Sequence, residues 1–176
     1  MGQIVVGMAD CRVAAAPDEV LATFALGSCI GLSMYDGKAG VGGMLHYMVP
    51  DSTIDPARGR ITPCMFADLG IPLLLQQMRA KGAHPRNLVA HAAGGASIMD
   101  PNNIFDIGKR NYLALRKLLW KTGVLLSGEA VGGNHSRSVR LEIGSGRLWV
   151  RESGGPQELV SMQKGGVNGV SGIDRG

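Results

Sequence analysis

Short apolar runs separated by turn signals dominate residues 1–50. Runs rich in β-branched and other apolar residues between turn residues predict strands. They fall at residues 4–8, 11–15, 21–26, 30–35 and 41–49. Asp36-Gly37, between the last two runs, is a strong hairpin signal. We therefore expect a β-meander, in which these strands pair in the order of the chain.

The pattern changes after Pro50. The polar residues 51–60 predict a loop, and Thr62-Pro63 is a favourable start for a helix. Apolar residues at helical spacing continue this helix toward Gly82, which can end it. A proline inside a helix removes a backbone hydrogen bond, so Pro72 is expected to kink or split it.

A second helix and further strands complete the chain. Asp106 is a candidate N-cap for a helix that runs to about Lys121 and stops at Gly123. Additional strands are expected at residues 88–92, 124–131, 139–143 and 148–151. Strands grouped at both ends around two main helices predict an α+β fold, a mixed α/β layered sandwich with a central β-sheet meander.

The length of 176 residues and an apolar fraction of 45% indicate one domain with a substantial core. From about Ser153 onward the sequence is rich in glycine and poor in bulky apolar side chains. We expect a single domain over residues 1–160 and a flexible, glycine-rich C-terminal tail over residues 161–176.

Charge and targeting signals exclude several classes. The net charge of +4 comes from scattered basic residues, so no stripe for nucleic acid is present. The N-terminus does not resemble a secretory signal, and no apolar stretch is long enough to span a membrane. A cytoplasmic protein with reduced thiols is expected, without membrane insertion. The three cysteines include no C-x-x-C pair, which argues against structural zinc.

Cys29 and His46 are the main candidates for chemistry. Cys29 lies between Gly27 and Gly31, where backbone N–H groups can approach a developing oxyanion. A hairpin of strands 30–35 and 41–49 can bring the two side chains together, and an adjacent imidazole activates a thiol. The alternatives are a small buried cysteine and a histidine bonded within the core. The α/β-hydrolase elbow needs a helix after the nucleophile, where a strand is expected here.

Other polar residues are weaker candidates. Thr23, on the preceding strand, can orient the imidazole through its hydroxyl, although its residue type also suits an ordinary strand position. The remaining cysteines and histidines lack a pattern that ties them to a site: Cys11, Cys64, His84, His91 and His135. Their spacing does not resemble a metal site, and Gly94-Gly95 lacks the lysine and further glycine of nucleotide-binding loops.

Several motifs occur together along the chain, namely Thr23-x5-Cys29-x16-His46-x3-Pro50, Leu26-Gly27-Ser28-Cys29, Gly42-Gly43, Gly94-Gly95-Ala96, Ile107-Gly108-Lys109-Arg110-Asn111, and Gly132-Gly133 followed by Arg137. In this order they resemble the CheD family, the chemoreceptor glutamine deamidases of bacterial chemotaxis. The resemblance runs from about residue 4 to residue 151.

The resemblance implies an amidohydrolase with Cys29 as nucleophile, His46 as base and acid, and Thr23 as the group that orients His46. Its substrate would be a glutamine side-chain amide in the cytoplasmic region of a methyl-accepting chemotaxis receptor. A thioester would form, and glutamyl methyl esters could react in the same way. The resemblance implies no cofactor or metal, a layered fold similar to the catalytic domain of deamidating cytotoxic toxins, and CheC, a phosphatase of the response regulator, as an optional partner.

Three residues depart from the family pattern, namely His91, Lys109 and Ser136. They stand outside the Thr23, Cys29 and His46 set, so they bear on the choice of partner or receptor more than on the chemistry. Two other functions stay open at this point. One is a non-catalytic adaptor that binds a chemotaxis regulator such as CheC, and the other is a cysteine hydrolase with a small-molecule substrate.

Overall fold

The computed structural model describes residues 2–98, 100, 102 and 104–161. Its strands are β1 (Gly2–Val5), β2 (Asp10–Ala14), β3 (Glu19–Leu26), β4 (Ile30–Asp36), β5 (Val41–Tyr47), β6 (Leu88–Gly94), β7 (Leu125–Val131), β8 (Arg137–Glu142), β9 (Arg147–Glu152) and β10 (Gln157–Ser161). Its α-helices are α1 (Pro56–Ile61), α2 (Ala67–Ala80) and α3 (Ile107–Thr122). Three 3-10 turns join them, namely η1 (Ser52–Ile54), η2 (Pro63–Met65) and η3 (Pro85–Asn87).

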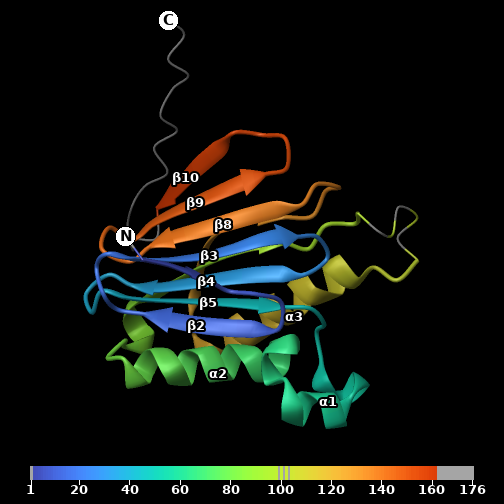
Figure 1. The fold of residues 1–176 in the computed structure, drawn as a ribbon. Coiled ribbons are helices and arrows are strands. Elements are labelled where there is room, and N and C mark those ends of the chain that lie inside the picture. The colour runs from blue at the N-terminus through green and yellow to red at the C-terminus, as the bar shows by residue number, and fades with distance from the viewer. Residues whose placement is uncertain (1, 99, 101, 103, 162–176) are drawn as a thin grey trace, which may run out of the picture.

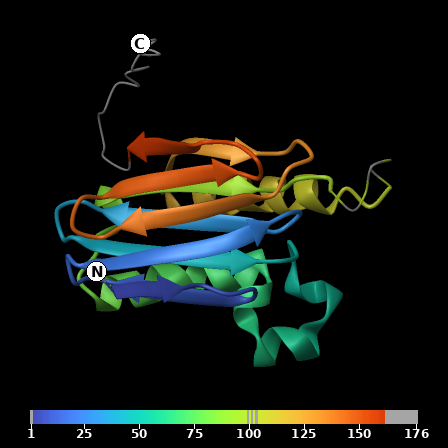
Figure 2. The same cartoon turned by 45° about the horizontal axis from the view of Figure 1, so that its top comes forward.

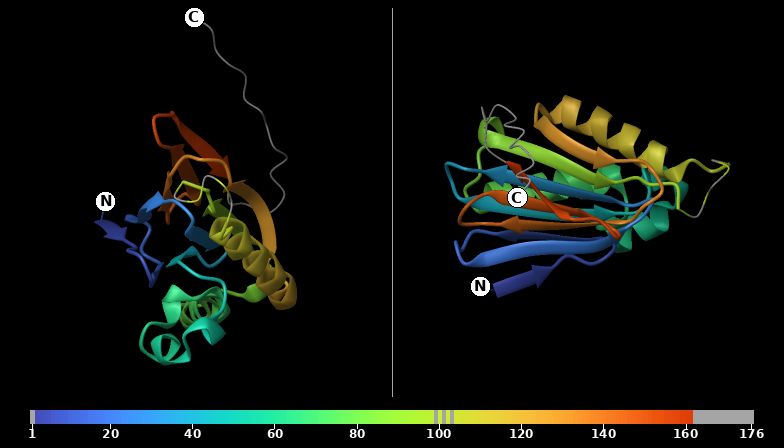
Figure 3. Two further views of the ribbon diagram at one scale, coloured as in Figure 1. Left: turned by 90° about the vertical axis from the view of Figure 1, so that its right-hand side faces the viewer. Right: turned by 90° about the horizontal axis from the view of Figure 1, so that it is seen from above.

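The described strands form two five-stranded sheets that pack face to face. The outer sheet has the order β1-β3-β8-β9-β10, and the central sheet has the order β2-β5-β4-β6-β7. Helices α2 and α3 cover the other face of the central sheet, so the layers run sheet, sheet, helices (Figures 1 and 3). In Figure 2 the strands of the outer sheet come forward over the central one.

The two faces of the central sheet bury two separate apolar clusters. Side chains alternate along a strand, so Ile30, Leu32 and Met34 of β4 face the helices. Tyr35 of the same strand packs in the inter-sheet cluster with Met44 of β5. The same alternation on β5 directs His46 toward the inter-sheet layer.

The expected α+β layered architecture is confirmed, whereas the β-meander is wrong. Strands β4 and β5 form the expected hairpin, with Gly31 opposite His46. However, β3 pairs with β8 and β1, and β2 pairs with β5, so neighbours in the chain alternate between the sheets. Strand patterns record which faces are buried and do not specify the partner strand, which is why the sequence alone misassigned the pairing.

The segment after Pro50 also differs from its expected form. The predicted loop contains η1 and α1, and the helix expected from Thr62 is divided into η2 and α2 at Phe66, which is extended. Pro72 does not split α2, which is continuous through it. Proline removes only its own N–H donor, and packing of the apolar side of α2 against the central sheet maintains the helix.

Two expectations at the ends of elements need correction. Asp106 precedes α3 in a left-handed conformation and makes no side-chain capping bond, whereas Gly123 ends this helix at φ 70° as expected. Strand β10 was not expected, and it includes Ser161, the first residue of the predicted tail. The rest of that tail lies outside the described residues.

Among the described residues, none of the helices has both the length and the apolar character that a membrane span requires.

Candidate active site

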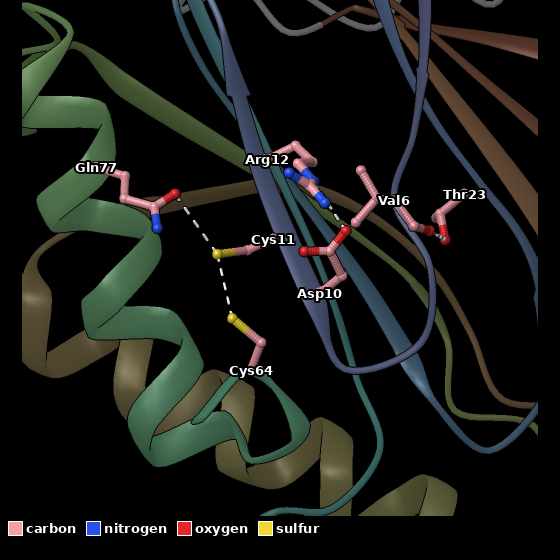
Figure 4. Close-up of polar contacts among 7 residues, drawn as sticks. All are labelled: Val6, Asp10, Cys11, Arg12, Thr23, Cys64 and Gln77. Carbon is pink, nitrogen blue, oxygen red and sulfur yellow. Dashed lines mark hydrogen bonds and ion pairs between the residues drawn. The ribbon is translucent and has the colours of Figure 1, made fainter. Parts of the chain in front are cut away.

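Thr23 of β3 and His46 of β5 meet between the two sheets. Both side chains are buried, and Thr23 Oγ1 lies 2.9 Å from His46 Nδ1. The Thr23 hydroxyl also donates a hydrogen bond to the carbonyl of Val6 at 2.8 Å (Figure 4). A hydroxyl has one hydrogen, so the contact with His46 must be donated by the ring Nδ1–H. Thr23 thereby fixes the tautomer that leaves a lone pair on His46 Nε2.

His46 Nε2 is available as a proton acceptor. This atom is buried and has no hydrogen-bond partner among the described residues. Burial lowers the pKa of His46, because the charged imidazolium loses solvation between the sheets. The ring is therefore neutral at neutral pH, with a free basic nitrogen.

Cys29 lies at the entrance to β4, on the same side of the central sheet as His46. Gly31 is directly opposite His46, so Cys29, two residues earlier, is its diagonal neighbour across the hairpin. Cys29 is half-buried and packs against the inter-sheet cluster. The thiol–imidazole hydrogen bond that the sequence predicts is not formed in this structure, because Nε2 lacks a partner within the described part of the chain.

The electrostatics keep the resting thiol protonated. Burial raises the pKa of Cys29, although a hydrogen bond from its own backbone N–H opposes this effect. The pKa of the neighbouring Tyr47 is raised well above its ordinary value, first by burial and then by the Cys29 thiolate. A thiolate at Cys29 is therefore formed most readily when the proton moves to a nearby base.

A β-bulge shapes the chain between Thr23 and Cys29. The pairing of β3 with β8 shifts between Thr23 and Leu26, and Ala25 within this bulge has φ 55°. The backbone of a residue other than glycine rarely adopts this left-handed conformation, so the bulge stores backbone strain. It ends β3 and turns the chain into the loop of Gly27 and Ser28, which leads to Cys29.

The turn formed by Gly94, Gly95 and Ala96 holds this loop from β6. Gly95 N donates to the carbonyl of Cys29 at 2.9 Å, and Ala96 N donates to the carbonyl of Gly27 at 2.8 Å. A Cβ atom at Gly94 would lie 2.1 Å from the Cys29 carbonyl oxygen, and its φ is 110°. Only glycine permits this approach, which explains the double glycine of the sequence motif.

Asn111 of α3 joins the two halves of the site, a role that the sequence did not predict. Its fully buried Nδ2 donates to the carbonyl of Ser28 at 3.0 Å and to the carbonyl of Met48 at 2.8 Å. Ser28 precedes Cys29, and Met48 follows His46 by two residues. The main-chain carbonyl of Asn111 also accepts a hydrogen bond from the Tyr47 hydroxyl at 2.7 Å. Its membership of the Ile107–Asn111 motif was the available signal.

Arg137 stabilises the glycine turn through hydrogen bonds to main-chain carbonyls. Its Nη1 donates to the carbonyl of Gly132 at 2.7 Å, and its Nη2 contacts the Glu152 carboxylate at 2.7 Å. Gly132 N in turn donates to the carbonyl of Gly94 at 2.9 Å. The motif residues scattered from Gly94 to Arg137 therefore converge on one loop, the loop that carries Cys29.

The other cysteines and histidines lie away from this loop. Cys11 and Cys64 belong to the helix-side cluster, and His84 and His135 are exposed. His91 is buried on β6 opposite Ser33 of β4. Groups of three His, Cys, Asp or Glu side chains that could hold a metal ion do not occur among the described residues.

A cleft of about 160 Å³ adjoins the Cys29 loop. Its lining includes Ser28, Ser97, Phe105 and Gly108, so it lies between the loop and the start of α3. Ile104 and Phe105 are largely exposed beside it, and Ile98 lies over Gly27. The arrangement offers a narrow recess with an apolar rim beside Ser28, the residue before Cys29.

A comparison with protein families identifies the chain. Residues 48–152 match the family model described as CheD chemotactic sensory transduction. This chain belongs to the CheD family. The matched span includes the CheD segments that hold the Cys29 loop, from the Gly94 turn through Asn111 to Arg137.

Individual relatives agree with the CheD assignment. The chain is 71% identical over 168 residues to the probable chemoreceptor glutamine deamidase CheD of Solibacter usitatus (strain Ellin6076), covering 94% of this chain and 99% of the relative. It is 48% identical over 156 residues to probable chemoreceptor glutamine deamidase CheD 1 of Syntrophus aciditrophicus (strain SB), covering 89% and 98%. The comparisons confirm the expected family and, with it, the expectation of a chemoreceptor glutamine deamidase in chemotaxis.

The fold also aligns in part with a solved structure. A Neisseria meningitidis protein of the family DUF152 aligns with a TM-score of 0.43 and 12% identity, over 76% of this chain and 63% of that protein. A likeness of this size supports no inference about function.

Proposed function

We propose that this protein hydrolyses the side-chain amide of glutamine residues in a chemoreceptor, with Cys29 as nucleophile, His46 as general base and acid, and Thr23 as the residue that orients His46. The observation that carries the proposal is the contact of Thr23 with His46 Nδ1, which leaves a free lone pair on Nε2 of a histidine that shares a face of the central sheet with Cys29. The names of the relatives supply the amide substrate.

In the first step, Nε2 accepts the thiol proton and the Cys29 sulfur attacks the amide carbon. The tetrahedral oxyanion collapses, and the C–N bond breaks. The imidazolium returns its proton to the leaving nitrogen, so ammonia departs and a glutamyl thioester remains on Cys29. The neutral resting thiol and neutral imidazole suit this order of events, because charge appears only when the proton moves.

In the second step, Nε2 accepts a proton from water, and the resulting hydroxide attacks the thioester. The C–S bond breaks, the sulfur regains its proton, and a glutamate side chain is released. A glutamyl methyl ester would pass through the same thioester with methanol as the leaving group. Methylesterase activity is therefore a proposed secondary reaction of this site.

The substrate residue would enter the cleft beside Ser28. A glutamine side chain is narrow, and its amide would enter the recess beside Ser28, the residue before Cys29. The exposed apolar side chains Ile98, Ile104 and Phe105 would contact the helical surface that carries the glutamine. Such receptor surfaces are cytoplasmic, which would place the protein in the cytoplasm, and a CheC-type phosphatase would be an additional partner.

Mass spectrometry of a purified chemoreceptor cytoplasmic fragment tests the reaction. Incubation with the protein is expected to raise the mass of particular glutamine peptides by about one unit, the amide-to-acid change. Cys29→Ala should abolish this change. Cys64→Ala removes a thiol from the helix-side cluster and should retain the activity, so it is the matched control.

Two outcomes would contradict the mechanism. Full deamidation by Cys29→Ala would remove this thiol from the chemistry. Tight binding of the fragment without a change of mass, under conditions in which a known deamidase modifies it, would instead identify the non-catalytic adaptor. Acid quenching of the wild-type reaction should in addition trap the acyl-enzyme on the peptide that contains Cys29.

A further inference from the structure

Cys11 and Cys64 are in contact although they are 53 residues apart in the chain. Cys11 lies on β2 and Cys64 lies in η2, and both side chains are 7% exposed. The Cys64 thiol donates a hydrogen bond to Cys11 Sγ at 3.2 Å, and Cys11 Sγ contacts Gln77 Oε1 of α2 at 3.6 Å (Figure 4). The two sulfur atoms need to approach by only about 1.2 Å to reach the length of a disulfide bond.

The surroundings distinguish the two sulfur atoms. The hydrogen bond from Cys64 lowers the pKa of Cys11, because it stabilises the Cys11 thiolate. The same bond, together with burial, raises the pKa of Cys64. Cys11 is thus the sulfur that ionises first and Cys64 the sulfur that keeps its proton. This is the asymmetry of a pair with an attacking and a resolving thiol.

Cys29 has no part in this pair. Cys11 and Cys64 pack in the cluster between the central sheet and the helices, and Cys29 packs in the cluster between the sheets. The central sheet therefore separates Cys29 from both other thiols. All three cysteines of the chain are free in this structure.

We propose that Cys11 and Cys64 form a redox modification site, in which a peroxide oxidises the pair to a disulfide bond and a dithiol reductant restores it. The Cys11 thiolate attacks hydrogen peroxide, the O–O bond breaks, and a sulfenic acid and hydroxide result. The Cys64 thiol then attacks the sulfenic sulfur, the S–O bond breaks, and water leaves. The pair loses two electrons and two protons, and the peroxide is reduced to two molecules of water.

The disulfide would cross-link two segments that are hydrogen-bonded to the strand that carries His46 and to the residues that follow it. Strand β2 pairs with β5, with Asp10 opposite His46. Just beyond the end of β5, Met48 N and Val49 N both donate to the carbonyl of Met65, the last residue of η2. Closing a long loop restricts the unfolded chain, so the oxidised protein is expected to melt roughly 5–10 °C above the reduced one.

Peptide mapping of the folded, full-length protein after brief treatment with hydrogen peroxide tests this site. The expected result is a loss of two hydrogens and a cross-linked peptide containing Cys11 and Cys64, reversed by dithiothreitol. Under denaturing conditions the number of titratable thiols should fall by two. The Cys29→Ser variant should form the same cross-link, because its remaining thiols are the pair itself.

Cys64→Ser and Cys11→Ser should each form no cross-link and show no rise in melting temperature on oxidation. Having both variants keeps the test decisive if one of them folds poorly. Oxidation of Cys29 alone, with Cys11 and Cys64 still reduced, would overturn the proposal. A cross-link between Cys29 and either other cysteine in the folded protein would also overturn it, as would resistance of the pair to peroxide.

Discussion

The thiols on the two faces of the central sheet have different neighbouring side chains. On the inter-sheet face, Cys29 neighbours a neutral imidazole with a free nitrogen, held by Thr23. On the helix face, Cys11 and Cys64 neighbour each other amid aliphatic side chains. Both buried histidines of the described residues, His46 and His91, lie on strand positions that face the outer sheet.

The difference shows how neighbours decide what a thiol does. A thiol next to a base can pass its proton on and attack a carbonyl carbon. A thiol next to a second thiol has no base but has a partner for a disulfide bond. The sheet keeps the two chemistries apart, because alternation along its strands directs Cys11 of β2 to the helix face and His46 of β5 to the inter-sheet face.

The largest expected effect comes from Gly94→Ala, which disrupts the inter-sheet side of the comparison. Its Cβ would lie 2.1 Å from the Cys29 carbonyl oxygen, so the backbone of the loop must move. We expect the free energy of unfolding to fall by at least about 4 kcal/mol, and we expect the deamidase activity to be lost as well. Urea unfolding and the deamidation assay measure these changes.

Gly82→Ala is the matched control for this variant. Gly82 has φ 98°, comparable to the φ of Gly94, but nothing lies within 4 Å of its added Cβ. It carries the strain of the left-handed conformation without the collision, so its cost should be about 1–2 kcal/mol and its activity normal. Equal losses in both variants would show that strain, and not contact with Cys29, makes Gly94 necessary.

An intermediate effect is expected from pH, through His91. Burial lowers the pKa of His91 to about 4, against a smaller opposing effect of the Glu129 carboxylate. The unfolded chain takes up this proton near pH 6.5 and the folded chain does not. The contribution of His91 to stability is therefore fully present above about pH 6.5 and is lost as pH drops toward 4, by about 3 kcal/mol.

Urea unfolding between pH 7.5 and pH 4.5 measures this loss. His91→Leu should flatten most of the dependence, with His46 contributing to the remainder because its pKa is also lowered. The loss should persist in His84→Gln, which removes an exposed imidazole and keeps His91 in place. A His91→Leu variant with the full pH dependence would show that the buried charge penalty does not act at this position.

The smallest effect is expected from Thr23→Val, which keeps the shape of the side chain and removes the acceptor for His46 Nδ1–H. We expect kcat to fall roughly 10–100-fold. The acid limb of the pH–rate profile should move to lower pH, because the imidazolium loses a stabilising hydrogen bond. Thr23→Ser retains the hydroxyl and should keep most activity. A fall in kcat without a shift of the acid limb would argue for a packing role alone.

Several parts of the fold and the site could be predicted from the sequence because their signals are local. The hairpin of β4 and β5 follows from Asp36-Gly37, and Gly123 ends α3 because glycine tolerates its left-handed conformation. Cys29 precedes the first strand of that hairpin and His46 lies near the end of the second. Both therefore fall at its open end, and the sequence could predict that they are neighbours. Thr23 entered through the family motif, because nothing in its own residue type distinguishes it from an ordinary strand threonine.

The sequence by itself determined most of the strands, the two main helices and the family of the chain, because periodicity, turn residues and motif spacing are properties of short segments. It missed α1 and β10. Only the tertiary structure decided that β3 joins the outer sheet and thereby brings Thr23 to His46. It also decided the meeting of Asn111 with Ser28 and of Cys11 with Cys64, across 83 and 53 residues. Strand and helix patterns leave partners open, and those partners are fixed only when complementary apolar faces pack together.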